Sequence, residues 1–467
     1  MPTTIATQST PLLARYKAVR HATANLCRPL SPEDMMVQSC PEASPVKWHL
    51  AHTSWFFETF VLREFVATYQ PFHPDFAWLF NSYYNSLGDM PEKKLRSSFS
   101  RPPLDAILAY RTHVDAAMDR LLQHPLEDEA ARRIVLGLEH EQQHQELIAT
   151  DIKHALFTNP LHPAYIEASP EQKPTTTIAP PLDWISFNPG LTEIGLTLDP
   201  NSTEAFAFDN EIPRHKVYIA PYRLANRPVT CAEYLTFMEQ NGYNRPELWL
   251  SEGWITQRAE AWQAPLYWHR DSTTKSGWCI YTLRGFIPLE DLSETPVCHL
   301  SFFEADAYAR WAGHRLPTEF EWEHATTQLN SPHLHSGVIL SEAKNPRISL
   351  EAAHSSPLVP QAIPGNLLET NNLHPTPATS VSGLQQIFGD VWEWTASGYT
   401  GYPGYHPLPG ALGEYNGKFM SSQMVLRGGS CVTPATHIRA TYRNFFTPAT
   451  RWQFSGLRLA QDATHPA

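Results

Sequence analysis

Cysteine is sparse in this chain, and the few cysteines are scattered. Six occur among 467 residues, and no two of them have the CxxC spacing. A zinc–thiolate site needs clustered cysteines, and a small disulfide-stabilised secreted domain needs many of them. We therefore expect neither, and we expect a protein of a reducing compartment. The six are Cys27, Cys40, Cys231, Cys279, Cys298 and Cys431.

Long apolar runs and an excess of positive charge are also missing. Residues 1–20 contain no apolar signal-peptide core, and no later run is long enough to cross a bilayer. There are 35 basic and 47 acidic residues, a formal net charge of −12, which disfavours nucleic-acid binding. The sequence predicts a cytoplasmic protein with neither nucleic-acid nor membrane partners. It leaves open whether the protein forms a homo-oligomer.

The first third of the chain has the apolar spacing of helices. The segments 10–30, 45–62, 102–124 and 129–157 repeat apolar residues at roughly helical intervals. A long connection separates the second segment from the third. Four helices arranged in this way indicate a bundle, so we predict a helical domain over residues 1–158.

The remainder of the chain has a different pattern. Residues 159–184 are rich in proline and threonine, which is typical of a linker. Short strands then alternate with helices, which predicts an α+β domain over residues 185–467. Within it, residues 326–364 are rich in Ser, His and Pro and are predicted to be a surface insertion. The clearest strands are expected at 217–219 and 424–426, and the clearest helices at 231–240 and 301–312.

The most informative stretch is His140-Glu141-Gln142-Gln143-His144. Residues four apart on a helix lie on one face, one turn apart, so both imidazoles point the same way. Two histidines on a half-buried helix are by themselves commonly structural. The predicted helix 45–62 carries two more, His49 and His52, and this second pair favours a metal site.

Two kinds of metal chemistry fit these histidines. The HExxH pattern is typical of zinc hydrolases, in which Glu141 would activate a water molecule. That reading needs a third ligand downstream, and Glu167 and Glu171 lie in the proline-rich linker. Alternatively, the third ligand comes from the second helix, at His52 or His49. Three neutral imidazoles suit Fe(II), Zn(II), Ni(II) or Cu(II).

A family resemblance narrows these alternatives. Trp48-His49-Leu50-Ala51-His52, followed by the HExxH stretch, resembles the DinB-like domain of the ergothioneine-biosynthetic sulfoxide synthases (EgtB family). The second half resembles their other domain, which is similar to the formylglycine-generating, sulfatase-modifying family. The resemblance implies a DinB-like four-helix bundle followed by a C-type-lectin-like α+β domain. The stretches that carry it in the second half are Asp209–His215, Trp311–Glu323, Phe388–Thr395, Leu426–Ser430 and Arg443–Phe446.

The resemblance also implies an activity. Members of this family use non-haem iron(II) and O2 to join a thiol to the imidazole C2 of hercynine, Nα-trimethylhistidine, and the product is a sulfoxide. The thiol is cysteine or γ-glutamylcysteine. The family's ligand positions correspond to His52, His140 and His144, which leaves His49 as a supporting residue.

The implied substrate contacts include one departure from the family. Gln143 and Asn444 match positions that hold hercynine. Phe445 and Phe446 stand where one branch has Trp-Asp, and that acid helps to bind γ-glutamylcysteine. An apolar side chain offers no partner to the glutamyl ammonium, and an unpaired buried charge is costly. Free cysteine is therefore the expected thiol.

The remaining expectations concern the proton donor and the thiol's carboxylate. Tyr83 and Tyr84 resemble one branch's catalytic tyrosines, with Tyr405 and Tyr415 as the next candidates. The carboxylate could be held by any of four basic residues. Two other classes stay open: a DinB-type thiol transferase that uses zinc or nickel without redox chemistry, and a non-catalytic binding module. The four basic residues are Lys93, Lys94, Arg96 and Arg101.

Overall fold

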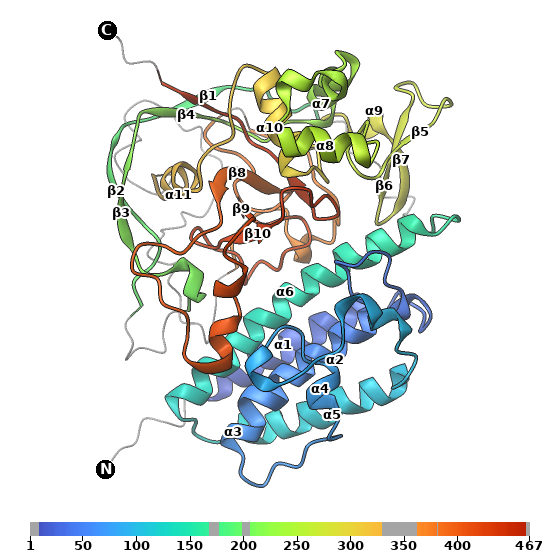
Figure 1. Cartoon of the computed structure of the whole chain (residues 1–467), viewed down its shortest axis with the longest axis vertical. Helices are drawn as coiled ribbons and strands as arrows, with labels where there is room; N and C mark the ends of the chain where they lie inside the picture. Colours follow the sequence, from blue (N-terminus) through green and yellow to red (C-terminus); the bar gives the residue numbers. More distant parts are fainter. Residues whose placement is uncertain (1–8, 168–176, 199–205, 329–361, 381, 464–467) are drawn as a thin grey trace.

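The computed structural model describes residues 9–167, 177–198, 206–328, 362–380 and 382–463 (Figure 1). It confirms a helical N-terminal part followed by a part that contains sheets. The predicted insertion lies mostly outside the described residues, and its first three residues, 326–328, are the end of a helix. Among the described residues, no helix is both long and apolar enough to span a membrane.

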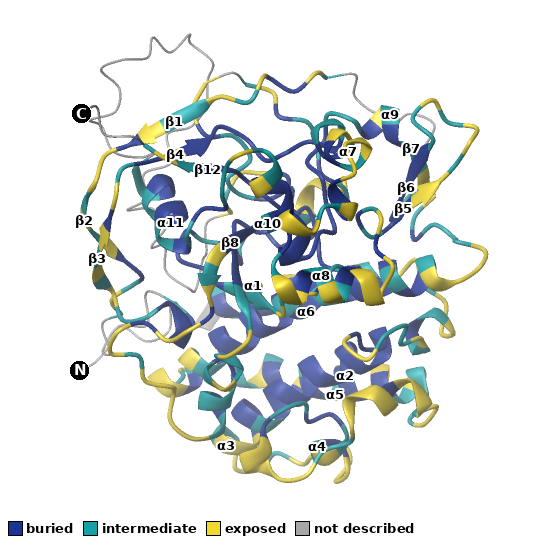
Figure 2. Cartoon of the chain, turned by 45° about the horizontal axis from the view of Figure 1, so that its top comes forward, coloured by how far each residue is buried: buried dark blue, intermediate teal, exposed yellow. Residues whose placement is uncertain are grey.

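Four long helices form the N-terminal part, and they fall on the four predicted segments. Helix α2 packs against α5 and α6, and α1 packs against α6. Every residue of α2 is buried, as Figure 2 shows, and this explains why its sequence is apolar on nearly all sides. The predicted second helix continues past α2 as a π-helical turn, Glu58–Leu62, and the short α3. The helices are α1 (Ser9–Cys27), α2 (Val46–Phe57), α3 (Arg63–Phe65), α4 (Phe76–Leu79), α5 (Leu104–Leu121) and α6 (Asp128–Thr158).

The C-terminal part contains small sheets flanked by helices. Its strands form sheets in the orders β1-β4-β12, β10-β9-β8-β11, β2-β3 and β5-β6-β7. The strands are β1 (Trp184–Phe187), β2 (Gly190–Ile194), β3 (His215–Ile219), β4 (Tyr222–Ala225), β5 (Trp268–Arg270), β6 (Trp278–Thr282), β7 (Gly285–Pro288), β8 (Trp392–Gly398), β9 (Met424–Arg427), β10 (Asn444–Phe446), β11 (Ser455–Gly456) and β12 (Ala460–Asp462). The helices are α7 (Cys231–Glu239), α8 (Ser251–Ala259), α9 (Leu289–Leu292), α10 (Phe302–Trp311) and α11 (Glu319–Gln328).

Capping residues determine where two of these helices begin. Thr230 accepts a hydrogen bond from the Glu233 N–H, and the Glu233 carboxylate accepts one from the Thr230 N–H, which starts α7. Ser301 and Glu304 form the same reciprocal pair at α10. Each is a capping box, and these two satisfy backbone donors that would otherwise be unpaired at the helix start.

Helix α6 lies between the two parts of the molecule (Figure 1). Its buried Glu146 accepts hydrogen bonds from the Trp392 indole at 2.6 Å and from the hydroxyls of Ser430 and Thr433, both at 2.8 Å. The segment after α6 also joins the two parts, because the Tyr165 hydroxyl donates to the Leu26 carbonyl. The helical part and the α+β part therefore share a polar, buried interface along α6.

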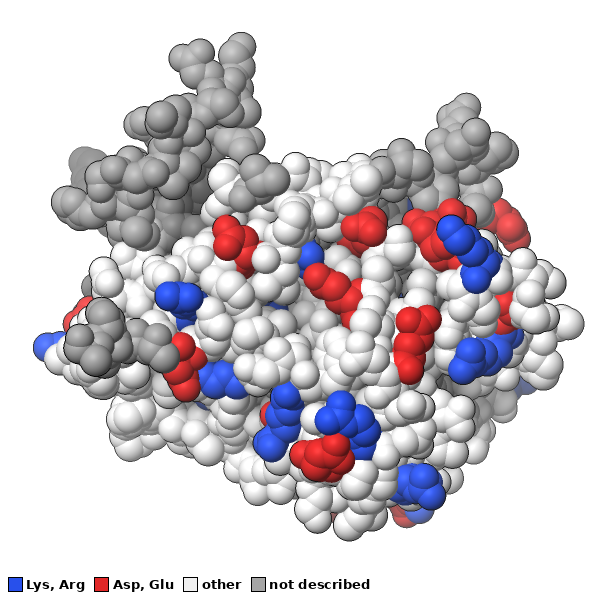
Figure 3. Space-filling view, turned by 90° about the horizontal axis from the view of Figure 1, so that it is seen from above, with Lys and Arg blue, Asp and Glu red and all other residues white. Residues whose placement is uncertain are grey.

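The surface seen from above carries both signs of charge. Figure 3 shows Lys and Arg side chains interspersed with Asp and Glu side chains on that face. The described residues on this face form no broad basic surface of the kind that a nucleic-acid backbone requires.

Close packing of α6 on α2 gives a prediction about Gly137. A Cβ at this position would lie 2.6 Å from Phe57 Cε1 and 3.0 Å from Phe56 Cδ1. Alanine is favoured over glycine in a helix by about 1 kcal/mol, but overpacking a core costs about 1–3 kcal/mol. We expect Gly137→Ala to lower the urea midpoint of unfolding. Gly190→Ala is the control, because a Cβ there meets nothing within 4 Å. An unchanged or higher midpoint for Gly137→Ala would contradict this packing.

Candidate metal centre

Three histidines from two helices meet in the interior. His52 comes from α2, and His140 and His144 come from α6; all three are buried, and each offers a ring nitrogen within 4.8 Å of the others. The Nε2 atoms of His140 and His144 are 3.1 Å apart. Two imidazoles bound to one ion at about 2.1 Å and at right angles would place their nitrogens about 3 Å apart. The spacing therefore suits two neighbouring ligands of one metal ion.

Hydrogen bonds orient these rings. His52 Nδ1 donates to the Phe80 carbonyl at 2.7 Å, and the buried Nε2 has no hydrogen-bond partner in the described part of the chain. A carboxylate oxygen of Asp151 lies 3.1 Å from His49 Nε2, and His49 Nδ1 lies 2.7 Å from His144 Nδ1. Since the carboxylate only accepts, His49 donates to it and accepts from His144 Nδ1–H. This series of hydrogen bonds leaves the lone pair of His144 Nε2 free, as a metal ligand requires.

His49 therefore contacts the cluster through His144 and is not one of its three members. Both of its ring nitrogens are engaged, one with Asp151 and one with His144. The geometry supports His52, rather than His49, as the third candidate ligand.

Burial keeps the three imidazoles neutral. Burial lowers the pKa of His140 to about 3, and burial followed by the neighbouring imidazole of His140 lowers the pKa of His52 and of His144 well below the usual value. The Trp48 ring stacks on His52, with centroids 4.4 Å apart. Neutral imidazole is the form that binds metal, so the site favours binding a metal over binding protons.

Glu141 points away from the histidines, which speaks against the zinc-hydrolase alternative. Its carboxylate accepts from Arg20 at 2.8 Å, Arg111 at 2.6 Å and Thr23 at 2.7 Å. Burial alone would raise its pKa, but Arg111 and Arg20 hold it at about 2. The motif's glutamate is thus an ion-pair anchor between α1, α5 and α6 and not a base beside a metal. Of the proposed downstream ligands, Glu167 is exposed, and Glu171 lies outside the described residues.

Gln143 lies beside the histidines and is held by two tyrosines from the other part of the chain. Its Nε2 donates to the Tyr442 hydroxyl at 2.6 Å, and its Oε1 accepts from the Tyr415 hydroxyl. The Tyr415 ring is 5.6 Å from the His140 ring. From the sequence, Tyr415 was predicted only as an alternative proton donor, and Tyr442 was not predicted as a site residue.

Tyr83 and Tyr84 are close to this group. Their ring centroids are 4.7 Å apart, and the Tyr83 ring is 6.3 Å from that of Tyr415. Tyr84 is fully buried, and burial raises the pKa of both phenols above the ordinary value. Their loop is fixed by Glu414, which accepts from the backbone N–H of Ser86 at 2.9 Å. Tyr405, in contrast, donates its hydroxyl to Asp209.

The predicted substrate residues of β10 are linked to the site less directly. Phe445 stacks on Tyr399 at 4.0 Å and lies 6.0 Å from Phe419, whose ring is 5.2 Å from Tyr83. Asn444 is half-buried, and its Oδ1 accepts from the next backbone N–H. The half-buried Phe446 has its ring near that of Trp452. The structure thus connects the strand to Tyr83 through aromatic contacts.

Of the four basic residues considered for the thiol's carboxylate, only Arg96 is buried. Its guanidinium lies 3.4 Å from the centre of the Trp48 ring and donates to the hydroxyls of Ser44 and Ser82. Burial lowers its pKa to about 9, and Asp151 opposes that shift. Because Trp48 stacks on His52, this cation is one aromatic ring away from the candidate ligands.

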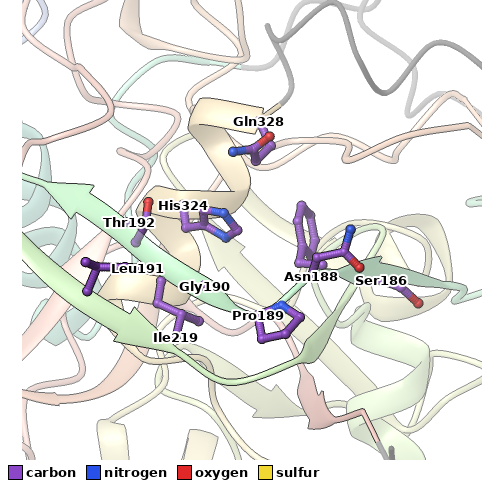
Figure 4. A pocket seen from close by; sticks show the side chains of 10 residues that line it. Ser186, Asn188, Pro189, Gly190, Leu191, Thr192, Ile219, His324 and Gln328 are labelled. Atoms are coloured by element: carbon purple, nitrogen blue, oxygen red, sulfur yellow. The ribbon is translucent and has the colours of Figure 1, made fainter. Parts of the chain in front are cut away.

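A pocket of about 390 Å³ lies elsewhere, between the β1–β2 turn and α11 (Figure 4). None of the three clustered histidines lines it. Its own histidine, His324, has Nδ1 3.0 Å from the Tyr222 hydroxyl. The lining residues are Ser186, Phe187, Asn188, Pro189, Gly190, Leu191, Thr192, Ile219, His324 and Gln328.

Comparison with known proteins gives the same division of the chain into two kinds of domain. Residues 15–148 match the DinB superfamily, and residues 170–463 match the sulfatase-modifying factor enzyme 1-like domain. The chain is 32% identical to the hercynine oxygenase of Mycolicibacterium smegmatis, over 90% of this chain and 92% of that protein. It is 30% identical to the hercynine oxygenase of Mycobacterium tuberculosis, over 92% and 93%.

The second part alone has more distant relatives. It is 26% identical to the formylglycine-generating enzyme of Streptomyces coelicolor, over 56% of this chain and 84% of that protein. The hercynine oxygenases match through both domains in the same order. The chain therefore belongs to the hercynine oxygenase family.

Proposed function

We propose that this protein is an iron(II)- and O2-dependent sulfoxide synthase of ergothioneine biosynthesis. It joins the thiol of cysteine to the imidazole C2 of hercynine and forms hercynylcysteine sulfoxide. The observation that carries the proposal is the buried triad of His52, His140 and His144 next to the amide of Gln143. The two hercynine oxygenases, which match over about nine-tenths of the chain, support the substrate assignment.

The histidines would hold the metal through their Nε2 atoms. His52 Nε2 is buried and has no partner among the residues that the structure describes, and a buried polar atom in that state is costly unless a ligand meets it. Three protein ligands leave positions open for substrates. Iron(II) bound there would supply the redox chemistry between O2 and the thiol sulfur.

The chain's own residues would bind and orient the substrates. We assign the hercynine imidazole to Gln143, with Asn444 as a second contact on β10. We assign the cysteine carboxylate to Arg96, because among the described residues this buried cation donates only to hydroxyls and has no carboxylate partner at hydrogen-bond distance. Phe446 offers no acid to a glutamyl ammonium, which supports cysteine as the thiol.

Tyr83 and Tyr84 would hold the proton that the reaction needs. A buried phenol with a raised pKa stays neutral and can donate its O–H. In the sulfoxide reaction, the thiol, the imidazole C–H and O2 would give the carbon–sulfur bond, one oxygen atom on sulfur and one molecule of water, and the phenol proton would favour this outcome. Without that proton, both oxygen atoms of O2 would go to the thiol sulfur, and cysteine sulfinate would result.

The finer architecture belongs to the same proposal. We assign residues 1–158 to a DinB-like four-helix bundle, 159–184 to a linker, and 185–467 to a C-type-lectin-like domain with an insertion over 326–364.

A thiol transferase that uses zinc or nickel would share the triad but would neither need O2 nor form a sulfoxide. The product therefore separates the two functions.

The function is tested by incubating the iron-loaded protein with hercynine, O2 and either cysteine or γ-glutamylcysteine. We expect a sulfoxide with a new carbon–sulfur bond, detected by mass spectrometry, and a higher kcat/KM for cysteine. Zinc-loaded protein is the control and should form no sulfoxide. Absence of any carbon–sulfur product with iron would refute the function, while preference for the dipeptide would refute only the choice of thiol.

The ligand assignment predicts how single histidine variants bind iron. His52→Ala, His140→Ala and His144→Ala should each lose stoichiometric iron, as measured by metal analysis after anaerobic loading. His49→Ala is the matched variant on the same helix. It should retain iron with an affinity lowered by about tenfold, since it only orients His144. If His49→Ala empties the site and His52→Ala does not, the assignment on α2 is wrong.

The proton-donor assignment predicts a change of product. Tyr83→Phe, Tyr84→Phe or the double variant should shift the product from the sulfoxide toward cysteine sulfinate while iron content stays unchanged. Tyr405→Phe is the control, because its hydroxyl is bonded to Asp209. A double variant with the unchanged product ratio would move the assignment to Tyr415.

A further inference from the structure

A row of hydrogen bonds runs from the interface to the amide of Gln143. Glu139 Oε2 lies 2.6 Å from His437 Nδ1, His437 Nε2 lies 3.1 Å from the Tyr442 hydroxyl, and that hydroxyl accepts from Gln143 Nε2 at 2.6 Å. We call Glu139, His437 and Tyr442 the relay. All three are buried, with at most 4% of each residue exposed.

The direction of each bond follows from the first member. Glu139 is ion-paired with Arg15 at 2.6 Å, and an ionised carboxylate can only accept. His437 therefore donates from Nδ1, and in the neutral imidazole its Nε2 is left as an acceptor. The Tyr442 O–H donates to that nitrogen, so the oxygen of Tyr442 must accept from Gln143.

The opposite amide orientation is unfavourable. A flipped Gln143 would turn Oε1 toward Tyr442, whose proton is already used for His437. It would also turn Nε2 toward Tyr415, whose hydroxyl now donates to Oε1. While His437 is neutral, reversing the relay would require an unprotonated Nδ1 to face Glu139, which sets a lone pair against a carboxylate. Buried networks of this kind specify one arrangement because every alternative leaves a polar group unpaired.

We propose that the relay is a positioning device that fixes the amide of Gln143 so that hercynine meets one defined N–H and one defined oxygen lone pair. This inference rests on the proposed function, because it assigns hercynine to Gln143. It adds three residues that touch no substrate and act only through the amide. Two of them come from the C-terminal part, so the part without metal ligands determines how the imidazole is held.

The test is hercynine binding, measured by calorimetry on iron-loaded protein under anaerobic conditions. Tyr442→Phe removes only the hydroxyl and should weaken hercynine binding about tenfold, the effect of one well-placed hydrogen bond. Iron content and the affinity for cysteine should stay unchanged. Tyr222→Phe is the matched control, because it loses a buried hydroxyl that donates to the Glu321 carbonyl at 2.8 Å.

A double variant separates positioning from a general structural effect. If Tyr442 acts through the amide, Tyr442→Phe should have no further effect on hercynine affinity in a Gln143→Ala background. His437→Asn provides a second variant, because an asparagine amide can still donate to Glu139 while the acceptor for Tyr442 is lost. It should weaken hercynine binding in the same direction.

The outcomes distinguish the two proposals. If hercynine binds the wild-type protein but Tyr442→Phe and His437→Asn bind it equally well, the relay is refuted and the function stands. The relay is also refuted if the effects of Tyr442→Phe and Gln143→Ala are additive. If hercynine does not bind the wild-type protein, the proposed function fails first.

Discussion

A buried charge on α6 must be neutralised from whichever side it faces, and the arrangement of the molecule around this helix follows from that requirement. Glu141 faces the helical part and is met by Arg20 and Arg111. Glu139 lies between the two parts, where Arg15 of α1 pairs with it from one side and His437 from the other. Glu146 faces the C-terminal part, where Trp392 and two hydroxyls donate to it. Breaking one buried pair by removing a partner costs about 3–5 kcal/mol, so both parts are held to α6 in a fixed register.

The polar atoms of His52, His140 and His144 are satisfied in a different way from these carboxylates. His140 and His144 approach each other through Nε2 atoms, and His52 presents a third buried nitrogen that has no hydrogen-bond partner among the described residues. A metal ion would satisfy all three at once. The same register brings Gln143 to the interface, where Tyr415 and Tyr442 meet it, and places Tyr83 and Tyr84 next to them. The candidate centre is thus built from ligands of one part and polar contacts of both.

Local sequence patterns were sufficient for the elements and for part of the site. The spacing of His140 and His144 and the apolar character of α2 predicted two helices that share a buried face, and the structure places them together. The helical spacing did not exclude Glu141 as a base, because HExxH zinc hydrolases carry their base at the same position. Arg20 and Arg111 gave no clear signal of a buried acid, because each is one of several charged residues in its helix.

The contacts of Gln143 could not be predicted in this way. Its partners Tyr415 and Tyr442 are about 300 residues away along the chain, and neither lies in a motif whose spacing indicates a hydrogen bond to α6. Such pairs depend on how the two parts pack against each other. For the same reason the sequence left four basic residues open, whereas burial beside Trp48 distinguishes Arg96 from the other three.

The most direct measurement is a crystal structure of the iron(II) protein with hercynine, grown without O2, with anomalous scattering recorded at the iron edge. This account predicts a single iron peak bonded to Nε2 of His52, His140 and His144, with the hercynine imidazole on the amide of Gln143 and Glu141 still paired with Arg20 and Arg111. An iron peak elsewhere, a ligand from His49 or Glu141, or hercynine bound away from Gln143 would contradict it.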